Sequence, residues 1–213
     1  LQTNSQSIYG ARHAGLQAGI PEEVPMLTVS RICGSGIQSI INGAQMIMLE
    51  EAATVVAGGM ENLSQAPHVI RGARDGWGLG RAPKVEDYMM TNLQDMTCGS
   101  FMAQTSDELC KRVDVKRQEV DEYAALSHAR TAASIDNDVF EQEIVPVTIK
   151  SRRGEVVLTH KDEDHLVRDC SAESLSKLPT AFGPESLVTA GKASGIVDGA
   201  AAVVIKSARK AQA

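Results

Sequence analysis

The stretch "PMLTVSRICGSGIQSIINGAQMIMLEEAATVVAGGM", residues 25–60, decides the fold class. It opens with an apolar, β-branched run, 25–32, which predicts a buried strand. Apolar residues then recur at helical spacing through 34–51. The run 53–60 predicts a second buried strand that ends in a glycine turn. Strand, helix and strand within roughly 35 residues indicate a βαβ unit, so we expect an α/β protein with a parallel or mixed sheet and helices on its faces.

A helix is expected before this stretch. Asn4 is a candidate N-cap, and Gly19 followed by Pro21 ends the helix. The apolar side of the helix carries Ile8, Ala11 and Leu16. Because the sequence opens at Leu1 within a helical pattern, we expect that a strand of the same sheet precedes it.

The sequence changes character at about Ser64, where glycine, arginine and methionine follow one another without a clear period. Helices are expected again at 103–112 and 116–135, the second with Val120, Tyr123, Ala124, Ser127 and Thr131 on one side. The runs 143–150 and 155–160, joined by "SRRG", predict a hairpin.

A strand of small and β-branched residues begins at Asp198. The simplest division of the chain is a core at 1–63, an inserted α+β loop domain at 64–196 and a core strand that returns at 197–213.

Composition limits the classes of partner. The 213 residues are 43% hydrophobic and carry a formal net charge of −6. A sizeable core is therefore expected, while nucleic acid and anionic membrane are disfavoured as partners, because phosphate binding needs a basic face. No stretch approaches the roughly 18 apolar residues of a membrane span. The four cysteines form no C-x-x-C pair, so we expect neither a zinc site nor a disulfide framework, and a reducing compartment, the cytoplasm, is the simpler interpretation.

Cys33 stands at the corner between the first expected strand and its helix. The free N–H groups and the positive end of the dipole at a helix N-terminus favour a thiolate over a thiol. Gly34 and Gly36 leave room for a flat electrophile, and their amides are candidates to face an oxyanion. The alternative is that Cys33 is a small core residue. Cys98, Cys110 and Cys170 lack such a glycine corner, so a structural role is expected for them.

Three segments resemble the thiolase family, in the same order along the chain. "RICGSGIQSI" (31–40) resembles the nucleophile segment, "VVAGGMENLSQAPH" (55–68) the stretch after it, and "VTAGKASGIVDGAAAVVI" (188–205) the segment that closes the inserted loop domain. The opening residues, 1–21, resemble the helix that precedes the nucleophile strand. The resemblance is nearest to degradative 3-ketoacyl-CoA thiolases, and it implies a thiolase-like layered fold of which this chain is the N-terminal half.

The resemblance also implies roles for single residues. It makes Cys33 the nucleophile that is acylated by 3-ketoacyl-CoA and then passes the acyl group to coenzyme A, which is a substrate rather than a separate cofactor. The backbone N–H of Cys33 would also serve in an oxyanion hole. Ser194 matches a serine that contacts the pantetheine chain, and pocket-lining positions match Ala190, Phe182 and Met102.

The nucleotide end of coenzyme A is matched by other residues. Arg168 resembles an arginine that covers the adenine, and Ser174 resembles a serine near the ribose phosphate. Further positive charge is available from Arg152, Arg153 and Lys177, for which the alternative is a solvated surface charge.

Two positions depart from the family's pattern. Phe101 stands where biosynthetic relatives carry histidine beside the pocket, which favours a longer or different acyl chain. Lys192 replaces the asparagine of many relatives, and the sequence leaves open whether this lysine touches ligand or solvent.

The family's remaining catalytic segments have no counterpart in these 213 residues. In thiolases a second, similar half supplies an Asn-Glu-Ala-Phe stretch, a Gly-His-Pro histidine that activates the nucleophile, and a second cysteine. The histidines here lie in no matching context and are expected to be surface or structural; they are His13, His68, His128, His160 and His165. We therefore expect that activity needs the C-terminal thiolase half, and that this half covers an apolar face of the chain.

Three functional interpretations follow. The first is a thiolase acting on acyl-CoA and coenzyme A, a homodimer or homotetramer assembled in part through 70–90, in the cytoplasm or, in a eukaryote, in mitochondria or peroxisomes. The second is another condensing enzyme of the same superfamily, such as a ketoacyl synthase. The third is a non-catalytic CoA-binding or lipid-carrier-associated protein, or a fragment with a structural role.

Overall fold

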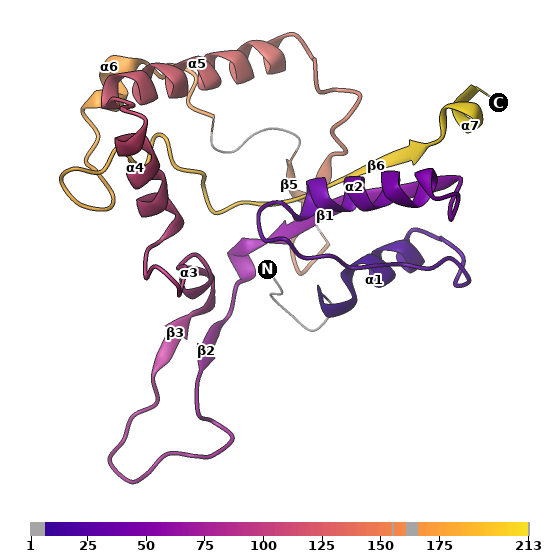
Figure 1. The fold of residues 1–213 in the computed structure, drawn as a ribbon, viewed down its shortest axis with the longest axis horizontal. Coiled ribbons are helices and arrows are strands. Elements are labelled where there is room, and N and C mark those ends of the chain that lie inside the picture. Colours follow the sequence, from indigo (N-terminus) through magenta and orange to yellow (C-terminus); the bar gives the residue numbers. More distant parts are fainter. Residues whose placement is uncertain (1–6, 155, 161–165, 213) are drawn as a thin grey trace. The chain divides into compact units, whose positions relative to one another are not determined.

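The structure, a computed structural model, describes residues 7–154, 156–160 and 166–212 (Figure 1). Asn4 and His165 lie outside the described residues. The helices are η1 (Ser7–Tyr9), α1 (Gly10–Gln17), α2 (Ser35–Met48), η2 (Leu63–Gln65), α3 (Tyr88–Asn92), α4 (Met102–Arg112), α5 (Arg117–Asp136), α6 (Ala172–Ser176) and α7 (Ala208–Gln212). The strands are β1 (Thr54–Asn62), β2 (His68–Ile70), β3 (Val85–Asp87), β4 (Val147–Lys150), β5 (Val156–His160) and β6 (Asp198–Lys206). The elements are mixed α and β, as expected.

The chain forms two compact units. One comprises Leu1–Leu93 with Ile196–Ala213, and the other Gln94–Gly195. The first unit thus takes in residues 64–93, which the sequence places with the inserted domain. One physical reason lies at η2, where the carboxylate of Asp198 accepts hydrogen bonds from the backbone N–H (2.9 Å) and the hydroxyl of Ser64. These bonds tie the end of β1 to the start of β6.

The centre of the first unit is the antiparallel pair β1 and β6, in register from Thr54↔Lys206 to Asn62↔Asp198. Helix α2 lies along both strands (Figure 1). A Cβ added to Gly43 would lie 3.0 Å from Val55 Cγ1 and 3.1 Å from Ile205 Cδ1. The helix therefore approaches the strands closely because it presents a residue without a side chain.

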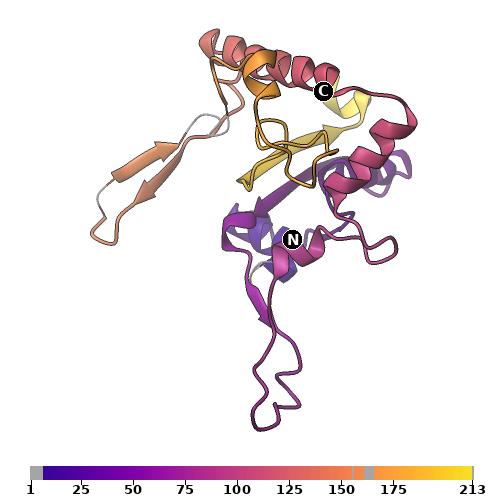
Figure 2. The same cartoon turned by 90° about the vertical axis from the view of Figure 1, so that its left-hand side faces the viewer.

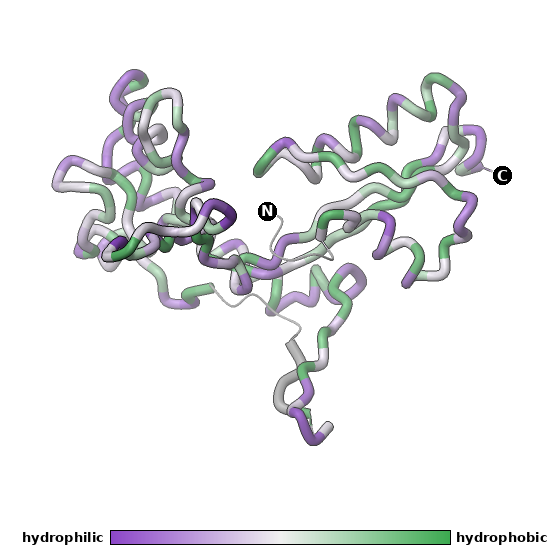
Figure 3. Tube along the Cα trace, turned by 90° about the horizontal axis from the view of Figure 1, so that it is seen from below, coloured by the Kyte–Doolittle hydropathy of each residue, from purple (hydrophilic) through white to green (hydrophobic). Residues whose placement is uncertain are grey.

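Both strands form as expected, but the expectation that they are buried is wrong. The hydropathy colouring along this pair runs mostly from white to green (Figure 3), yet among its described hydrophobic residues only Ala57 is buried, whereas Val56 is 57% and Val204 63% exposed. On α2, large apolar side chains are exposed as well; they are Ile37, Ile40, Ile41 and Met48. The physical reason is that, within the described part of the chain, the sheet has two strands and α2 covers it through small residues. An apolar surface is left uncovered, as the sequence predicts.

The prediction of a strand at 25–32 is also wrong. The segment is irregular, and its only ladder contact within the described residues is an isolated parallel bridge between Arg31 and Cys33. Thr28 Oγ1 accepts a hydrogen bond from Ala11 N at 3.4 Å, and a Cβ on Gly15 would collide with Met26, so the segment runs against α1 instead. β-Branched residues favour extended backbone, but a strand requires a neighbour to complete its ladder. The parallel βαβ unit is therefore not formed.

The stretch after β1 forms a short antiparallel pair, β2 with β3, in the register His68↔Asp87 to Ile70↔Val85. Glu86 on β3 accepts hydrogen bonds from Arg71 Nε at 2.8 Å and pairs with Lys84 Nζ at 2.9 Å. These bonds lower the pKa of the Glu86 carboxyl. The basic residues at the two ends of the 71–84 loop, Arg71 and Lys84, are thus joined through the carboxylate of Glu86.

Helices α4 and α5 and the hairpin β4–β5 confirm the sequence prediction for the second unit (Figure 2). The packed side of α5 differs from the expected one, because Tyr123 is 71% exposed while Asp121 is buried at 1%. No helix among the described residues has both the length and the apolar character that a membrane crossing requires.

Candidate active site

Cys33 lies exposed at a sharp corner before α2, between Ile32 and the N-cap residue Gly34. Ile32 has a φ of 51°, a left-handed conformation that β-branched residues rarely adopt. Such conformations cost on the order of 1–3 kcal/mol and cluster where function requires a particular backbone path. The exposure of Cys33 disfavours its interpretation as a buried core residue.

Hydrogen bonds hold this corner in place. Ser35 Oγ accepts from the N–H of Arg31 at 2.9 Å and donates to the carbonyl of Ile32 at 2.7 Å. The N–H of Gly34 donates to the carbonyl of Arg31 at 3.0 Å, and a Cβ on Gly34 would lie only 3.3 Å from that oxygen. A side chain at position 34 would therefore crowd the turn, and glycine avoids this crowding.

The first turn of α2 is seated on β1 through small residues. Ser39 Oγ donates to the carbonyl of Gly58 at 2.9 Å, and a Cβ on Gly59 would lie 3.5 Å from Gly36 Cα. A Cβ on Gly36 itself would meet nothing within 4 Å, so the position is open on that side of the first turn of α2. These contacts fix the corner relative to the strand.

The other cysteines differ in accessibility. Cys98 is exposed, whereas Cys110 and Cys170 are half-buried. Burial raises the pKa of the Cys170 thiol, which disfavours its thiolate. Cys98 thus differs from a packed structural cysteine and is the natural comparison for the reactivity of Cys33.

In the second unit, two of the predicted pocket residues, Phe101 and Phe182, meet, and Met102 follows Phe101 in the chain. Phe101 and Met102 begin α4, where Phe101 N donates to Gln104 Oε1 at 2.9 Å. The ring of Phe101 lies 6.1 Å from the ring of Phe182, measured between centroids, at an interplanar angle of 40°. Two aromatic side chains from distant parts of the sequence therefore form one apolar wall.

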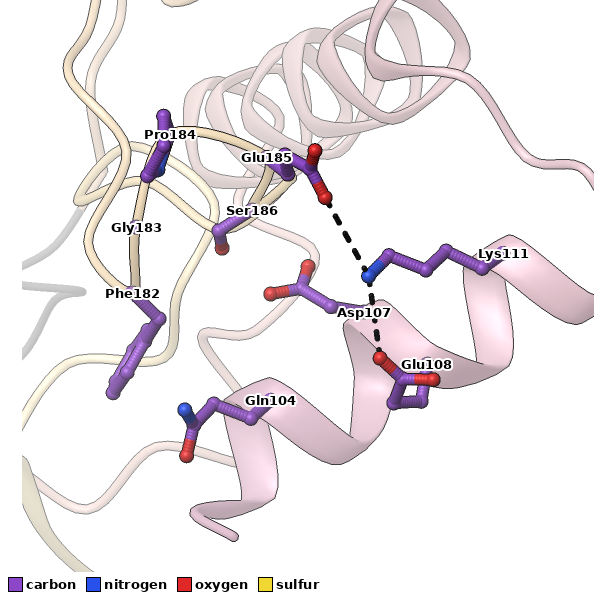
Figure 4. Close-up of a pocket in the computed structure, with 9 residues that line it drawn as sticks. All are labelled: Gln104, Asp107, Glu108, Lys111, Phe182, Gly183, Pro184, Glu185 and Ser186. Atoms are coloured by element: carbon purple, nitrogen blue, oxygen red, sulfur yellow. Dashed lines mark hydrogen bonds and ion pairs between the residues drawn. The ribbon is translucent and has the colours of Figure 1, made fainter.

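A shallow hollow lies beside Phe182, between α4 and the 182–186 loop (Figure 4). Its lining also includes Gln104, Asp107, Glu108, Lys111, Glu185 and Ser186. Lys111 Nζ lies 3.2 Å from Glu108 and 3.9 Å from Glu185, and Asp107 accepts from Leu187 N at 2.9 Å. With three carboxylates and one ammonium, this hollow disfavours phosphate groups.

Ala190 and Ser194 are both exposed on a tight turn, residues 189–194, which we call the 189–194 turn. The N–H groups of Lys192 and Ala193 donate to the carbonyl of Thr189 at 3.1 and 2.9 Å. The turn therefore presents Ala190 and Ser194 to solvent on a hydrogen-bonded backbone.

Arg168 and Ser174 have other partners in the structure. Arg168 Nη1 lies 2.7 Å from Asp136 Oδ1 at the end of α5, in a pair that is at least half exposed. Ser174 Oγ donates to the carbonyl of Ser171 at 2.8 Å and accepts its N–H at 3.1 Å, as a cap of α6. An exposed ion pair contributes little, so a ligand can displace Asp136 from Arg168.

The remaining basic candidates are exposed. Arg152 and Arg153 lie in the turn between β4 and β5, and Lys177 Nζ pairs with Glu173 at 2.7 Å on α6. These positions fit the interpretation of solvated surface charge.

The side chains of His160 and His165 lie outside the described part of the chain, and the other three histidines make structural contacts or lie exposed. His13 packs edge-on against Tyr9 at 6.0 Å, His128 Nδ1 accepts from Val167 N at 3.2 Å, and His68 lies exposed in β2. Among the described residues, no group of three or more His, Cys, Asp or Glu side chains is arranged to hold a metal ion.

Sequence reasoning missed a buried charge cluster. The carboxylate of Asp121 pairs with Arg117 Nε at 2.9 Å and with Lys192 Nζ at 2.8 Å. The Lys192 side chain is only 4% exposed. Arg117 and Asp121 are four residues apart on α5, a spacing that permits an ion pair, and Lys192 interrupts an otherwise small-residue run. The first signal is common on helix surfaces, so it did not indicate burial.

Cys33 belongs to the first unit, and the other candidate residues belong to the second.

Residues 1–209 match the family described as "Thiolase, N-terminal domain". Human mitochondrial 3-ketoacyl-CoA thiolase is 43% identical over 207 residues, which are 97% of this chain and 52% of that protein. The acetyl-CoA acetyltransferase of Cupriavidus necator is 40% identical over 202 residues, 95% of this chain and 51% of that protein.

A solved structure agrees. The crystal structure of human mitochondrial 3-ketoacyl-CoA thiolase in complex with CoA superposes with a TM-score of 0.91 at 41% identity, and covers 100% of this chain and 52% of that one. The chain thus spans about half the length of the relatives that it matches. With nearly all of its residues matched, this chain belongs to the thiolase family, within the family's N-terminal domain.

Proposed function

We propose that the protein to which this chain belongs is an acyltransferase that exchanges acyl groups between a 3-ketoacyl-CoA and coenzyme A through a thioester at Cys33. The observation that carries the proposal is the exposed Cys33, held on a strained, hydrogen-bonded corner at the start of α2. A nucleophile must be both accessible and positioned, and a buried structural cysteine needs neither property.

The reaction proceeds in two steps. The Cys33 sulfur attacks the 3-keto carbonyl, the bond between the α and β carbons breaks, and the released acetyl-CoA carbanion takes up a proton. The thiol of coenzyme A then loses its proton and attacks the thioester. This attack forms acyl-CoA and releases the thiolate of Cys33. Backbone N–H groups at the corner, from Cys33 and Gly36, are the candidates for the oxyanion of each tetrahedral intermediate, since the N–H of Gly34 already donates to the carbonyl of Arg31.

The proton transfers require groups beyond this chain. In thiolases the histidine and the second cysteine belong to the C-terminal half, so we infer that this half is needed for turnover. The exposed apolar residues of α2 and of the β1–β6 pair are consistent with a surface that such a half covers.

For coenzyme A, we assign the pantetheine chain to Ser194 and Ala190, and the acyl or thioester region to Phe101, Met102 and Phe182. Arg168 and Ser174 are assigned to the nucleotide, where displacement of Asp136 frees the guanidinium for the adenine. The acidic hollow beside Phe182 supports placing the phosphates elsewhere. Coenzyme A enters as a substrate, and the proposal requires no separate cofactor.

The biological setting belongs to the proposal as well. We infer a role in fatty acid metabolism, a homodimer or homotetramer, and a reducing compartment, the cytoplasm or, in a eukaryote, mitochondria or peroxisomes. The four free cysteines and the need for a reactive thiol at Cys33 support the reducing compartment.

The test is to incubate the full-length protein with acetoacetyl-CoA and to locate the acetyl group by mass spectrometry. We expect it on Cys33, absent in Cys33→Ser and retained in the matched control Cys98→Ser, since Cys98 is also exposed. Iodoacetamide should label Cys33 faster than Cys98, and Cys170 slowly because of its raised thiol pKa.

An acetyl adduct at another residue, or none, would overturn the proposal. Binding of coenzyme A without an adduct would favour the non-catalytic alternative. An adduct that forms from an acyl-carrier thioester, without cleavage of acetoacetyl-CoA, would favour another condensing enzyme.

A further inference from the structure

The 189–194 turn is held by side chains from two other elements of the second unit. Lys192 points inward: its side chain is 4% exposed and its ammonium lies 2.8 Å from Asp121 Oδ1 on α5. The sequence left open whether this lysine touches ligand or solvent, and its burial answers that it faces the protein. Burying an ammonium is unfavourable unless it is paired, so the pair with Asp121 anchors the turn to α5.

The same carboxylate is held by a second cation. Arg117 donates from Nε to Asp121 Oδ2 at 2.9 Å and Oδ1 at 3.2 Å. Its Nη2 donates to the carbonyls of Leu175 at 2.9 Å and Leu178 at 3.2 Å. Arg117 thereby joins α5 to α6 and to the residue just after it.

The leucines that Arg117 contacts through their carbonyls also pack against the 189–194 turn. A Cβ on Gly191 would lie 2.5 Å from Leu175 Cδ2 and 2.7 Å from Leu178 Cδ1, so the backbone of the turn rests directly on these two leucines. The links from Lys192 to Asp121, to Arg117, to the leucines and back to Gly191 form a closed ring. A ring of contacts restricts the turn more than any single contact, because each link limits the motion that another permits.

The geometry points to Lys192 as a positioning residue: by pairing with Asp121 it holds the 189–194 turn so that Ser194 and Ala190 are oriented for coenzyme A. Ser194 is two residues from Lys192, and its hydroxyl is exposed, with a contact of 3.4 Å to the neighbouring Gly195 carbonyl. A hydroxyl with such a weak local contact depends on the backbone for its position. This inference rests on the proposed function, and it adds a role for a lysine that has no contact with the ligand.

The test uses the full-length protein with Lys192→Met, in which a side chain of similar length loses its charge. Asp121 keeps Arg117 as its partner, so no buried charge is left unpaired and the fold is expected to persist. Lys116→Met is the matched control, because Lys116 is exposed one residue before Arg117 and pairs with Asp114. The contact of Lys192 Nζ with Asp121 is an ion pair without hydrogen-bond geometry, so Lys192→Gln, which also removes the charge, should behave like Lys192→Met.

We expect Lys192→Met to raise the KM for coenzyme A about tenfold with kcat nearly unchanged, the change that corresponds to loss of about one ligand hydrogen bond. Amide exchange in a peptide covering 189–194 should accelerate, because the Lys192 and Ala193 amides lose protection when the turn loosens. Lys116→Met should change neither quantity.

The two readouts separate the possible failures. Unchanged amide exchange over 189–194 in Lys192→Met would overturn the positioning role, whatever the activity. Faster exchange with an unaltered KM for coenzyme A would overturn it as well, because the lysine would then be purely structural. If the wild-type protein does not cleave acetoacetyl-CoA, the proposed function fails, and coenzyme A affinity measured by calorimetry replaces KM in deciding the inference.

Discussion

Replacing Gly191 by alanine tests how closely the 189–194 turn is packed. The new Cβ would lie 2.5 Å from Leu175 Cδ2 and 2.7 Å from Leu178 Cδ1. Carbon atoms prefer separations of about 3.5 Å or more, so each leucine methyl must withdraw by about 1 Å. Leu175 is only 4% exposed, and withdrawal therefore requires an unfavourable rotamer rather than movement into solvent.

The magnitude follows from opposing contributions. Forcing a side chain off its rotamer costs about 0.5–1.5 kcal/mol, so two leucines cost about 1–3 kcal/mol, the usual range for overpacking. The φ of Gly191 is outside the left-handed region, so alanine also reduces the entropy of the unfolded chain and returns about 0.4–1 kcal/mol. We expect Gly191→Ala to lower the free energy of unfolding by about 0.5–2 kcal/mol.

The assay is thermal unfolding of the full-length protein, followed by scanning calorimetry. For a protein about twice the length of this chain, the loss corresponds to a decrease in Tm on the order of 2 °C, because the unfolding entropy grows with length. Gly78→Ala is the control, because a Cβ there would meet only Arg81 Cδ at 3.9 Å. If Gly191→Ala were as stable as the wild type while Gly78→Ala behaved as expected, the turn would not rest on the leucines.

Two further variants probe single polar side chains, one in each unit. Thr189 is fully buried, and its hydroxyl has no hydrogen-bond partner among the described residues. Thr189→Val should therefore raise the free energy of unfolding, measured by urea titration, by about 1 kcal/mol. A decrease would show that the hydroxyl has a partner. Hydrogen bonds from Ser64 lower the pKa of the Asp198 carboxyl, so its contribution to stability is present above the unfolded pKa of about 4 and is lost as pH falls through the folded value. Asp198→Asn should therefore flatten the pH dependence of unfolding below about pH 4, and an unchanged acid profile would contradict this assignment.

Local patterns sufficed for most elements. The periodicity of 34–51, 103–112 and 116–135 corresponds to α2, α4 and α5, and the runs around "SRRG" correspond to β4 and β5. Helices and hairpins are stabilised by contacts between residues close in the sequence, so a sequence pattern is enough to predict them. The run 25–32 has an equally clear pattern, but its strand is absent because a ladder partner is not a local property.

The candidate site divides in the same way. Gly34 and Gly36 mark a corner at Cys33 in the sequence, but they leave a core role for this cysteine open, and its proposed role as nucleophile comes from the resemblance of the whole segment to thiolases. The contact of Phe101 with Phe182 and the burial of Lys192 against Asp121 join residues far apart in the chain.

What the sequence by itself determined is therefore the local conformation of most elements and the resemblance to the family that matches residues 1–209. Only the tertiary structure decided which charges are buried, because burial depends on what packs against a residue and not on its neighbours in the chain. A lysine that reads as a surface charge thus becomes the inward anchor of the 189–194 turn.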